Sequence, residues 1–298
     1  MAVTDIRPAA PGATSLGSGR GRIWKSLRRN PLGLAGGILL ALVVLVALLA
    51  PLLAPYDPAQ VHFATPFQKP GTVGFLLGTD DLGRDIFSRL VFGIRSSLEV
   101  GVLAVLLSVV IGTPLGLLAG YWRWLDAIIS RLNDVTLAFP FLIIAVGLVA
   151  ITGPSLGNAA VAIGIAHIPA MIRIIRGETL RIKESDFVIG AKTMDASGGR
   201  IIFQHILPNT ASSLIVQATV IMPAAVIGEA VLSFLGLGIQ PPAPSLGIML
   251  SDAQQYLFRS PTAAIVPGLG IAAICLAFNL FGDALRDALD PAATSRKK

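Results

Sequence analysis

Long apolar runs without charged residues alternate along this chain with short segments that carry Asp, Glu, Lys and Arg. A helix needs roughly 20 apolar residues to cross the hydrocarbon core of a bilayer. Runs of this length lie at 33–53, 100–121, 135–172, 201–228 and 260–282. The third run is too long for one span, and its middle has the turn composition Gly153-Pro154-Ser155. Splitting the run there gives six predicted transmembrane helices.

The predicted fold is therefore an all-α polytopic membrane protein. Many Gly and Pro residues follow the fifth span, so that stretch is predicted to be an outside loop, with a re-entrant course left open. The predicted segments are a cytoplasmic, partly disordered N-terminal segment at 1–30, a first transmembrane anchor at 31–54, an extracytoplasmic loop at 55–95, a five-helix core at 96–284 that includes an inside loop at 173–209 and an outside loop at 236–260, and a cytoplasmic tail at 285–298.

Composition and charge support this placement and orient the chain. Hydrophobic residues make up 54% of the 298 residues and charged residues only 13%, with a mean hydropathy of +0.76. With both termini inside, all but five of the 23 Lys and Arg residues lie on the cytoplasmic side. The net charge of +6 gathers at span ends, which fits lipid headgroups better than nucleic acid. The first apolar run starts too far from Met1 for a signal peptide and predicts an uncleaved anchor.

Four small residues recur every four positions in the second span: Ser108, Gly112, Gly116 and Gly120. Small side chains let another helix backbone approach closely, and helix association in lipid relies on such packing. The stripe therefore predicts a helix-packing surface. An interface with a second subunit and a contact within the chain fit it equally well.

Glu229 interrupts the fifth span, and an ionisable residue within a span is a candidate functional group. Counted from Ala211 at the helical rise, it lies about 27 Å along the span, and so near the outer surface. We regard it as a candidate for the translocation pathway. A hydrogen bond near a helix end would explain it as well.

No catalytic residue, bound cofactor or metal site is predicted. The three histidines, His62, His167 and His205, are scattered, with His167 expected at the inner end of the fourth span. The one cysteine, Cys275, has no partner in the sequence. None of the six lysines follows a glycine, so the chain lacks a Gly-Lys-Ser/Thr phosphate loop. ATP and its Mg²⁺ would have to bind another polypeptide.

The inside loop 173–209 is long enough that structure of its own is expected. Ser185 can cap a helix, and Asp186 favours the positive end of one. Gly198-Gly199 is expected to end this helix, and an amphipathic piece from Arg200 to Pro208 leads back to the membrane. A partner protein, lipid or the chain itself would each cover its apolar face. The residues expected on that face are Phe187, Val188, Ala191 and Met194.

Residues 187–209 resemble the cytoplasmic EAA loop of binding-protein-dependent ABC importer permeases. In that pattern a Glu-Ala-Ala triplet is followed by a glycine and then by an Ile-x-Leu-Pro ending. Both the Glu and the Gly are replaced here, while the frame is kept. The corresponding residues are Ile189-Gly190-Ala191 at the triplet, Asp195 at the glycine position and His205-Ile206-Leu207-Pro208-Asn209 at the ending.

Three further segments resemble the peptide/nickel/opine branch of that family, and specifically its DppC/OppC-type subunit. They read LGTDDLGRDIFSR at 77–89, LSFLGLGIQPP at 232–242 and NLFGDALRDALDP at 279–291. The segments stand in the expected order and span most of the chain after residue 77.

That resemblance implies a six-helix permease subunit, similar to those of type I ABC importers, in the bacterial cytoplasmic membrane. It implies three kinds of partner: a related second permease subunit, two cytoplasmic ABC ATPase subunits and an extracytoplasmic solute-binding protein. The segment 185–208 would dock on the ATPase and transmit its closure. Di- and oligopeptides are the implied solutes, with nickel chelates, opines and glutathione as alternatives.

Two other classes of membrane protein are weighed against this one. A self-sufficient channel or secondary carrier usually shows an internal repeat or ionisable residues at mid-membrane depth. The sequence shows no repeat, and Glu229 is expected to be peripheral. A membrane scaffold without transport would leave the structured inside loop and the three family-like segments unexplained.

Overall fold

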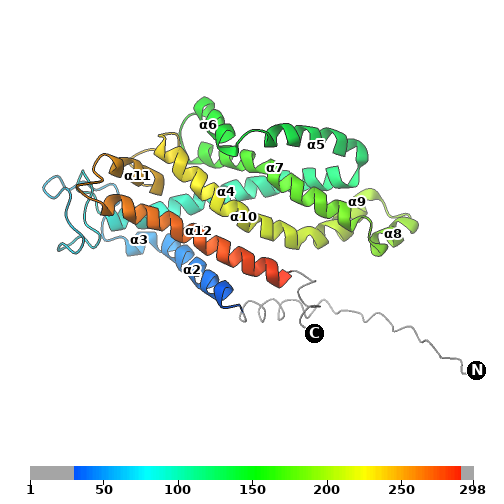
Figure 1. The fold of residues 1–298 in the computed structure, drawn as a ribbon, viewed down its shortest axis with the longest axis horizontal. Coiled ribbons are helices and arrows are strands. Elements are labelled where there is room, and N and C mark those ends of the chain that lie inside the picture. The colour runs from blue at the N-terminus through cyan, green and yellow to red at the C-terminus, as the bar shows by residue number, and fades with distance from the viewer. Residues whose placement is uncertain (1–29, 290–298) are drawn as a thin grey trace, which may run out of the picture.

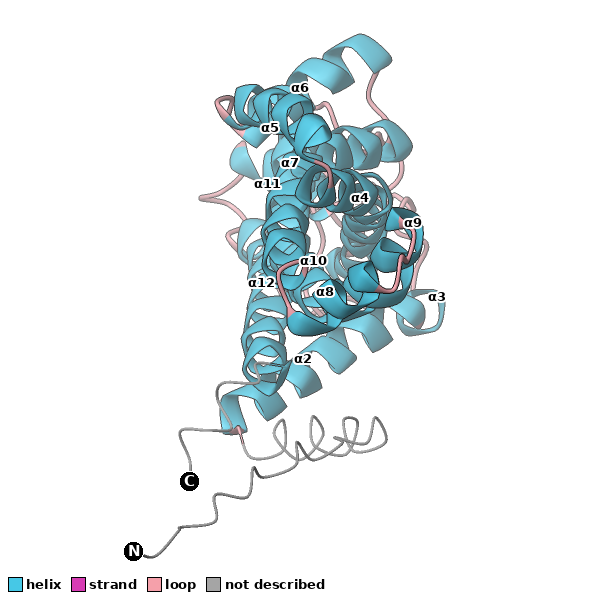
Figure 2. Cartoon of the chain, turned by 90° about the vertical axis from the view of Figure 1, so that its right-hand side faces the viewer, coloured by secondary structure: helices cyan, strands magenta, loops and turns pink. Residues whose placement is uncertain are grey.

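The computed structural model describes residues 30–289, which are mostly helical (Figure 2). Within this range no β-strand forms, and the two isolated bridges lie in the loop before Ile86. The predicted disordered segment 1–30 lies outside the described residues except for Asn30. The predicted tail 285–298 is described only as far as 289. The all-α prediction is confirmed for the part of the chain that is described.

The helices follow one another with short connections, apart from one long loop between 54 and 85 and a second at 235–245 (Figure 1). Their bounds are α2 Pro31–Leu48, α3 Ala50–Leu53, α4 Ile86–Tyr121, α5 Arg123–Leu137, α6 Phe141–Thr152, α7 Leu156–Ile182, α8 Asp186–Thr193, α9 Gly198–Ile201, the π-helical η2 Ile202–Ile206, α10 Leu207–Phe234, α11 Leu246–Gln254 and α12 Thr262–Leu289.

Between residues 30 and 289, five helical segments are long and apolar enough to cross a membrane: α2, α4, α7, α10 with its lead-in from Gly198, and α12. The helices α5 and α6 are long and apolar enough only when taken together, and the angle between them is 88°. The six predicted crossings thus correspond to five continuous helices and one bent pair. The bend falls at Pro140, whose ring fixes φ and whose nitrogen carries no hydrogen to donate.

Two helices start earlier than the predicted segments. The charged residues ahead of the apolar run at 135 form the helix α5, which starts at Arg123 and lies beside α7. Helix α4 starts at Ile86, within the predicted outside loop 55–95. Asp85 caps this helix by accepting a hydrogen bond from the Ser88 N–H at 2.8 Å.

The helices alternate in direction between two ends of the bundle. We call the end that holds Asn30, Leu289 and α8 the proximal end, and the end that holds 54–85 and 235–261 the distal end (Figure 1). Helices α2 and α10 run from proximal to distal. Helices α4, α7 and α12 run the opposite way. Both ends of the described chain therefore lie at the same end of the bundle as the predicted inside loop.

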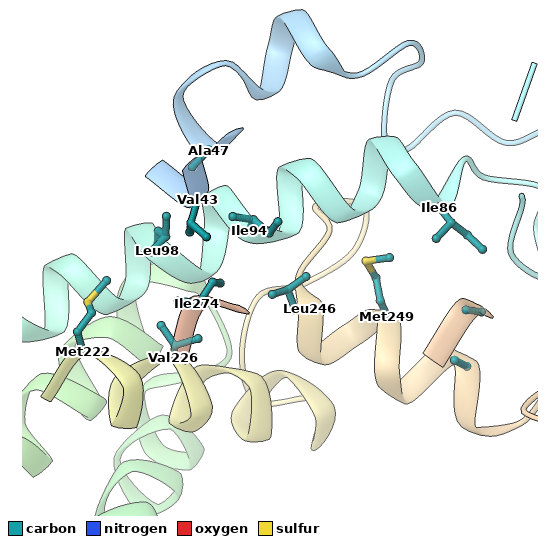
Figure 3. Packing of buried hydrophobic residues seen from close by; sticks show 12 residues of the cluster. Val43, Ala47, Ile86, Ile94, Leu98, Met222, Val226, Leu246, Met249 and Ile274 are labelled. Carbon is teal, nitrogen blue, oxygen red and sulfur yellow. The ribbon is translucent and has the colours of Figure 1, made fainter. Parts of the chain in front are cut away.

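Buried apolar side chains join the helices in three clusters. In the first, α2, α4, α10 and α12 meet at Val43, Leu98, Val226 and Ile274 (Figure 3). The second joins α4, α6, α7 and α10. The third joins the proximal ends of α4 and α7 to the segment α8–α10. The predicted inside loop is thus built onto the bundle core.

The predicted outside loop 236–260 contains the helix α11, which folds back into the distal end. Its first residue, Leu246, is completely buried. The Leu246 side chain lies against Gly93 of α4 and Gly270 of α12. Helix α11 also packs on α10. The start of α11 is therefore packed into the distal end of the bundle, while residues 240–243 before it remain exposed.

Candidate functional site

Helix α8 carries both buried and exposed apolar side chains. Val188 and Ala191 are buried in the proximal cluster. Phe187, Ile189 and Met194 are 49%, 48% and 80% exposed. Helical spacing places Phe187, Val188, Ala191 and Met194 on one side of the helix, since Ala191 follows Phe187 by four positions and precedes Met194 by three. Within this face Val188 and Ala191 are buried, whereas Phe187 and Met194 stay exposed at its edge. We call Phe187, Ile189 and Met194 the α8 surface.

Polar contacts fix the start of α8 to the helices of the bundle. The Lys183 Nζ donates a hydrogen bond to the Gly120 carbonyl at the end of α4, at 2.9 Å. Ser185 occupies the N-cap position, but its hydroxyl donates to the Ile182 carbonyl at 2.6 Å and caps no N–H of α8. Ser185 thus stands at the predicted N-cap position, but the predicted capping hydrogen bond of its side chain is wrong. Asp186 lies in the first turn, as expected.

Asp195 makes the turn that ends α8. Its φ is 57°, in the left-handed region that favours glycine, and the Ala196 N–H donates to the Ala191 carbonyl at 3.1 Å. This is the position at which the EAA pattern has its glycine. The prediction that Gly198-Gly199 ends α8 is wrong, since these residues begin α9, with Ser197 at its N-cap.

The segment from Gly198 to Phe234 is a continuous helical path that includes α9, η2 and α10. Arg200 donates to Gln204 at 2.9 Å, and the His205 ring lies 6.3 Å from the Phe187 ring. The Leu207 N–H donates to the Ile202 carbonyl, an i to i+5 bond of a π turn, just before Pro208. Because Pro208 cannot donate, the helical hydrogen bonds are shifted at this point. Leu207 and Pro208 then begin α10.

The small-residue stripe of α4 packs against α7 of the same chain. A Cβ added at Gly112 would lie 2.7 Å from the Met171 Cβ, and one at Gly116 would lie 2.8 Å from the Ile175 Cβ. Gly120 faces Thr179 in the same way, and Ser108 is completely buried. Of the two alternatives left by the sequence, the structure shows the contact within the chain.

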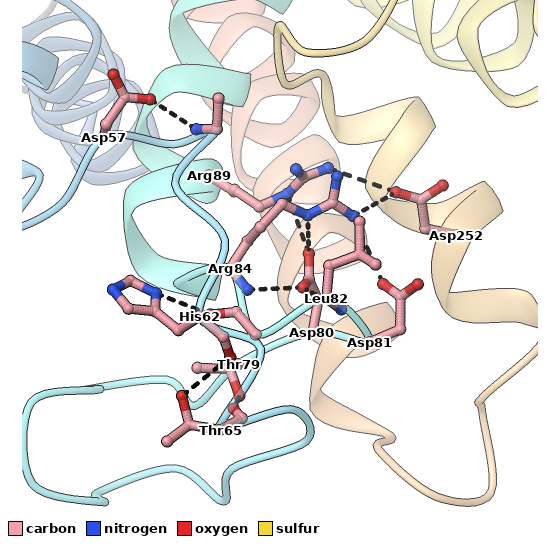
Figure 4. Close-up of polar contacts among 12 residues, drawn as sticks. Asp57, His62, Thr65, Thr79, Asp80, Asp81, Leu82, Arg84, Arg89 and Asp252 are labelled. Atoms are coloured by element: carbon pink, nitrogen blue, oxygen red, sulfur yellow. Dashed lines mark hydrogen bonds and ion pairs between the residues drawn. The ribbon is translucent and has the colours of Figure 1, made fainter.

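A network of charges joins the distal loop to α11 (Figure 4). The Arg84 Nε donates to Asp80 at 2.6 Å, and the Arg84 Nη2 lies 3.2 Å from Asp252 Oδ2. Arg89 lies 3.5 Å from the same Asp252 oxygen. Burial raises the pKa of Asp81 above its usual value of 3.8, and the neighbouring Asp80 adds to the rise. The sequence did not indicate this network, because Asp252 lies far away from the acidic turn along the chain.

Glu229 points into the protein interior and not toward the membrane surface. The Ser97 hydroxyl of α4 donates to Glu229 Oε2 at 2.7 Å, and the Ser233 hydroxyl donates to Oε1 at 2.7 Å. The side chain is completely buried. Glu229 lies five residues before the distal end of α10, so burial of the side chain leaves the predicted depth standing, and the predicted hydrogen bonding is found. Its role in the translocation pathway stays a prediction.

The histidines lie apart from one another. His167 lies in the middle of α7 rather than at its inner end, and it stacks on Phe141 with 5.0 Å between the ring centroids. His62 packs against Tyr56 in the distal loop. Residues 30–289 contain no group of three His, Cys, Asp or Glu side chains that could hold a metal ion.

The sequence matches two described families of membrane transport components. Residues 112–295 match the family described as binding-protein-dependent transport system inner membrane component. Residues 20–70 match the N-terminal TM domain of oligopeptide transport permease C.

Relatives cover nearly the whole chain. The dipeptide transport system permease protein DppC of Alkalihalophilus pseudofirmus is 45% identical, over 90% of this chain and 88% of that protein. The glutathione transport system permease protein GsiD of Pectobacterium atrosepticum is 43% identical, over 90% and 89%. An inward-facing structure of the MetNI methionine ABC transporter matches with a TM-score of 0.58 and 20% identity, over 69% of this chain and 98% of the matched chain. At that identity the likeness concerns the fold alone.

Proposed function

The chain belongs to the family of binding-protein-dependent transport system inner membrane components, and on this basis we propose that it forms half of the translocation pathway of an ATP-driven importer for di- and oligopeptides. It is a multi-pass permease subunit of the ABC importer class. In our proposal it lies in the bacterial cytoplasmic membrane. A related permease subunit supplies the other half of the pathway, and a solute-binding protein delivers the solute from outside.

The choice of solute rests on the relatives. One is named for dipeptides and another for glutathione, which is itself a small peptide. Each is more than 40% identical to this chain over most of its length. Small peptides are therefore the solute class that we propose, with glutathione as the alternative within that class.

The α8 surface is the observation that carries the proposed coupling to an ATPase. Phe187, Ile189 and Met194 are exposed at the tip of the proximal end, where α8 projects beyond the bundle (Figure 1). Charged Asp186 and Lys192 stand exposed beside them. Exposed apolar side chains beside charged ones are typical of a surface that binds another protein.

The orientation follows from the distribution of basic residues. The Lys- and Arg-rich inside loop 173–209 lies at the proximal end, so we place that end in the cytoplasm by the positive-inside rule. The ATPase subunits then meet the α8 surface from the cytoplasmic side. ATP hydrolysis belongs to those subunits, and this chain transmits its consequences to the membrane helices.

Transport in reconstituted vesicles tests the division of labour. Vesicles with both permease subunits, the ATPase subunits and the binding protein should accumulate a dipeptide when ATP is supplied. Vesicles that lack only the ATPase subunits should show no ATP-driven uptake. Uptake by this chain alone would contradict the proposal.

Substitution of Gly190 tests the docking surface separately. A Cβ at Gly190 meets nothing within 4 Å, so Gly190→Trp leaves the bundle undisturbed while obstructing the side of α8. Ala191 is a poorer choice because it is buried. Co-purification of the ATPase with Gly190→Trp or Met194→Glu should fall at least tenfold. Gly157→Trp, which is equally open but distal, is the matched control. Unchanged co-purification would refute docking at α8.

A further inference from the structure

Helix α4, helix α10 and the segment after α10 are joined by one buried chain of hydrogen bonds. Ser97 and Ser233 donate to the two oxygens of Glu229, each at 2.7 Å. The Ser233 hydroxyl oxygen in turn accepts from the Ile239 N–H at 3.2 Å. All four residues are buried, with exposed fractions of 3% or less. The chain of bonds therefore lies wholly inside the protein and links the two helices to the segment that follows.

The segment after α10 lies directly on the end of that helix. A Cβ at Gly238 would lie 2.7 Å from the Ser233 Cα, and one at Gly247 would lie 2.8 Å from the Ser233 Cβ. Ser233 is thus enclosed by the segment on both sides. Ser233 therefore takes part both in the hydrogen bonds of Glu229 and in the close packing of the segment on α10.

Glu229 depends on these hydrogen bonds because it has no ion pair among residues 30–289. A buried carboxylate whose hydrogen bonds are lost costs much more free energy than the bonds themselves contribute. Separation of α4 from α10 would leave the Glu229 oxygens without Ser97. The arrangement in which the segment closes the distal end is therefore favoured as long as Glu229 and the two serines stay together.

We propose that Glu229 is a positioning residue that holds the segment 235–254 closed over the distal end. The inference rests on the proposed function, in which the distal end is the extracytoplasmic entrance of the pathway. Glu229 does not contact the solute. It acts through Ser97 and Ser233, and it biases the equilibrium between a closed and an open entrance.

Cysteine labelling from outside measures this equilibrium. The probe position is Ile239→Cys, which is buried in the closed arrangement, in a Cys275→Ala background that has no other cysteine. The assembled importer, reconstituted in vesicles, is exposed to a membrane-impermeant maleimide. Addition of Ser97→Ala or Glu229→Leu should speed labelling at position 239 at least tenfold. The ATPase activity without binding protein should rise in the same variants.

Two further variants separate positioning from general damage. Glu229→Gln keeps a side chain that can accept from one serine and donate to the other, so its labelling rate should stay within about twofold of the parent. Ser96→Ala removes a neighbouring hydroxyl that donates to the Phe92 carbonyl of its own helix at 3.1 Å, and it should change nothing. Co-purification of the ATPase checks the assembly of every variant.

The inference is overturned if assembled Ser97→Ala labels no faster than the parent, or if Ser96→Ala labels as fast as Ser97→Ala. Should Glu229→Leu fail to assemble, Ser97→Ala decides alone, because it removes a single hydroxyl. Failure of the proposed function is a separate result. In that case the parent importer itself shows no ATP-driven dipeptide uptake, whatever the labelling rates.

Discussion

The guanidinium of Arg84 reaches the carboxylate of Asp252 across 168 positions of sequence, with 3.2 Å between Nη2 and Oδ2. Arg89 approaches the same oxygen at 3.5 Å (Figure 4). Asp252 therefore serves two arginines at once and attaches the distal loop to α11. Beside this carboxylate, the rings of Phe67 and Tyr256 lie 5.1 Å apart and Arg259 lies over the Phe67 ring, so the loop and the segment 246–259 are joined by charge and by aromatic packing.

Asp252→Asn should loosen the distal loop. It removes the negative charge that both arginines share, at a cost of about 1 kcal/mol, since the Asp252 side chain is 40% exposed and partly screened. Hydrogen exchange of the loop 54–85 should accelerate. Asp57→Asn is the control, because Asp57 bonds only the nearby Ala59 N–H. Equal exchange rates in Asp252→Asn and the parent would contradict the attachment.

Asp81→Asn should raise thermal stability at neutral pH. Burial raises the pKa of Asp81, and Asp80 adds to the rise, so the ionised form is disfavoured in the fold. The contribution of Asp81 to stability is fully present below its unfolded pKa and is lost as pH rises through the folded pKa. Asparagine does not ionise, so the variant keeps the free energy of unfolding that the parent loses as Asp81 ionises. Its gain in Tm should therefore shrink as the pH is lowered toward 3.8, and a gain that is independent of pH would refute the assignment.

Gly116→Leu should prevent α4 from packing on α7. Even the added Cβ would lie 2.8 Å from the Ile175 Cβ, so the helices must separate, at a cost of about 1–3 kcal/mol or more. Thermal unfolding in detergent and the yield of assembled importer should both fall. Gly177→Leu on α7 is the matched control, since a Cβ there meets nothing within 4 Å. Similar losses in both variants would argue against the α4–α7 contact.

Asp195→Gly should stabilise the end of α8. The backbone at Asp195 has φ 57°, which glycine adopts without the strain of a side chain, and the expected gain is about 0.5–1 kcal/mol. Slower hydrogen exchange within α8 would reveal it. Met194→Gly, at φ −87°, should instead speed exchange. A loss of protection in Asp195→Gly would show that the Asp side chain has a role of its own.

Periodic and compositional features were predictable from the sequence. The apolar runs predicted the crossings, and the stripe that includes Gly112 and Gly116 predicted close packing, although its partner needed the structure. The EAA frame placed a glycine position at Asp195, and the positive φ there gives a physical reason for glycine at that position.

Contacts distant in sequence were not predictable. Hydropathy assigns residues 123–134 to a loop because of their charges, but Asp126 pairs with Arg176 of α7 at 2.8 Å, which lets this stretch form a helix beside the bundle. For Glu229, the helical rise gave the depth along the span but not the direction of the side chain. Its inward orientation depends on Ser97, which lies on another helix.

The helical path from Gly198 to Phe234 comprises 37 residues. At the α-helical rise it measures about 55 Å, and it carries Glu229 at one end while its other end adjoins the α8 surface. One continuous helical segment thus joins the α8 surface, where we expect the ATPase to bind, to the distal end, where we expect the solute to enter. Thermodynamic linkage requires that influence along it be mutual. If binding of the loaded solute-binding protein changes the affinity of the chain for the ATPase, then binding of the ATPase changes the affinity for the loaded solute-binding protein by the same free energy.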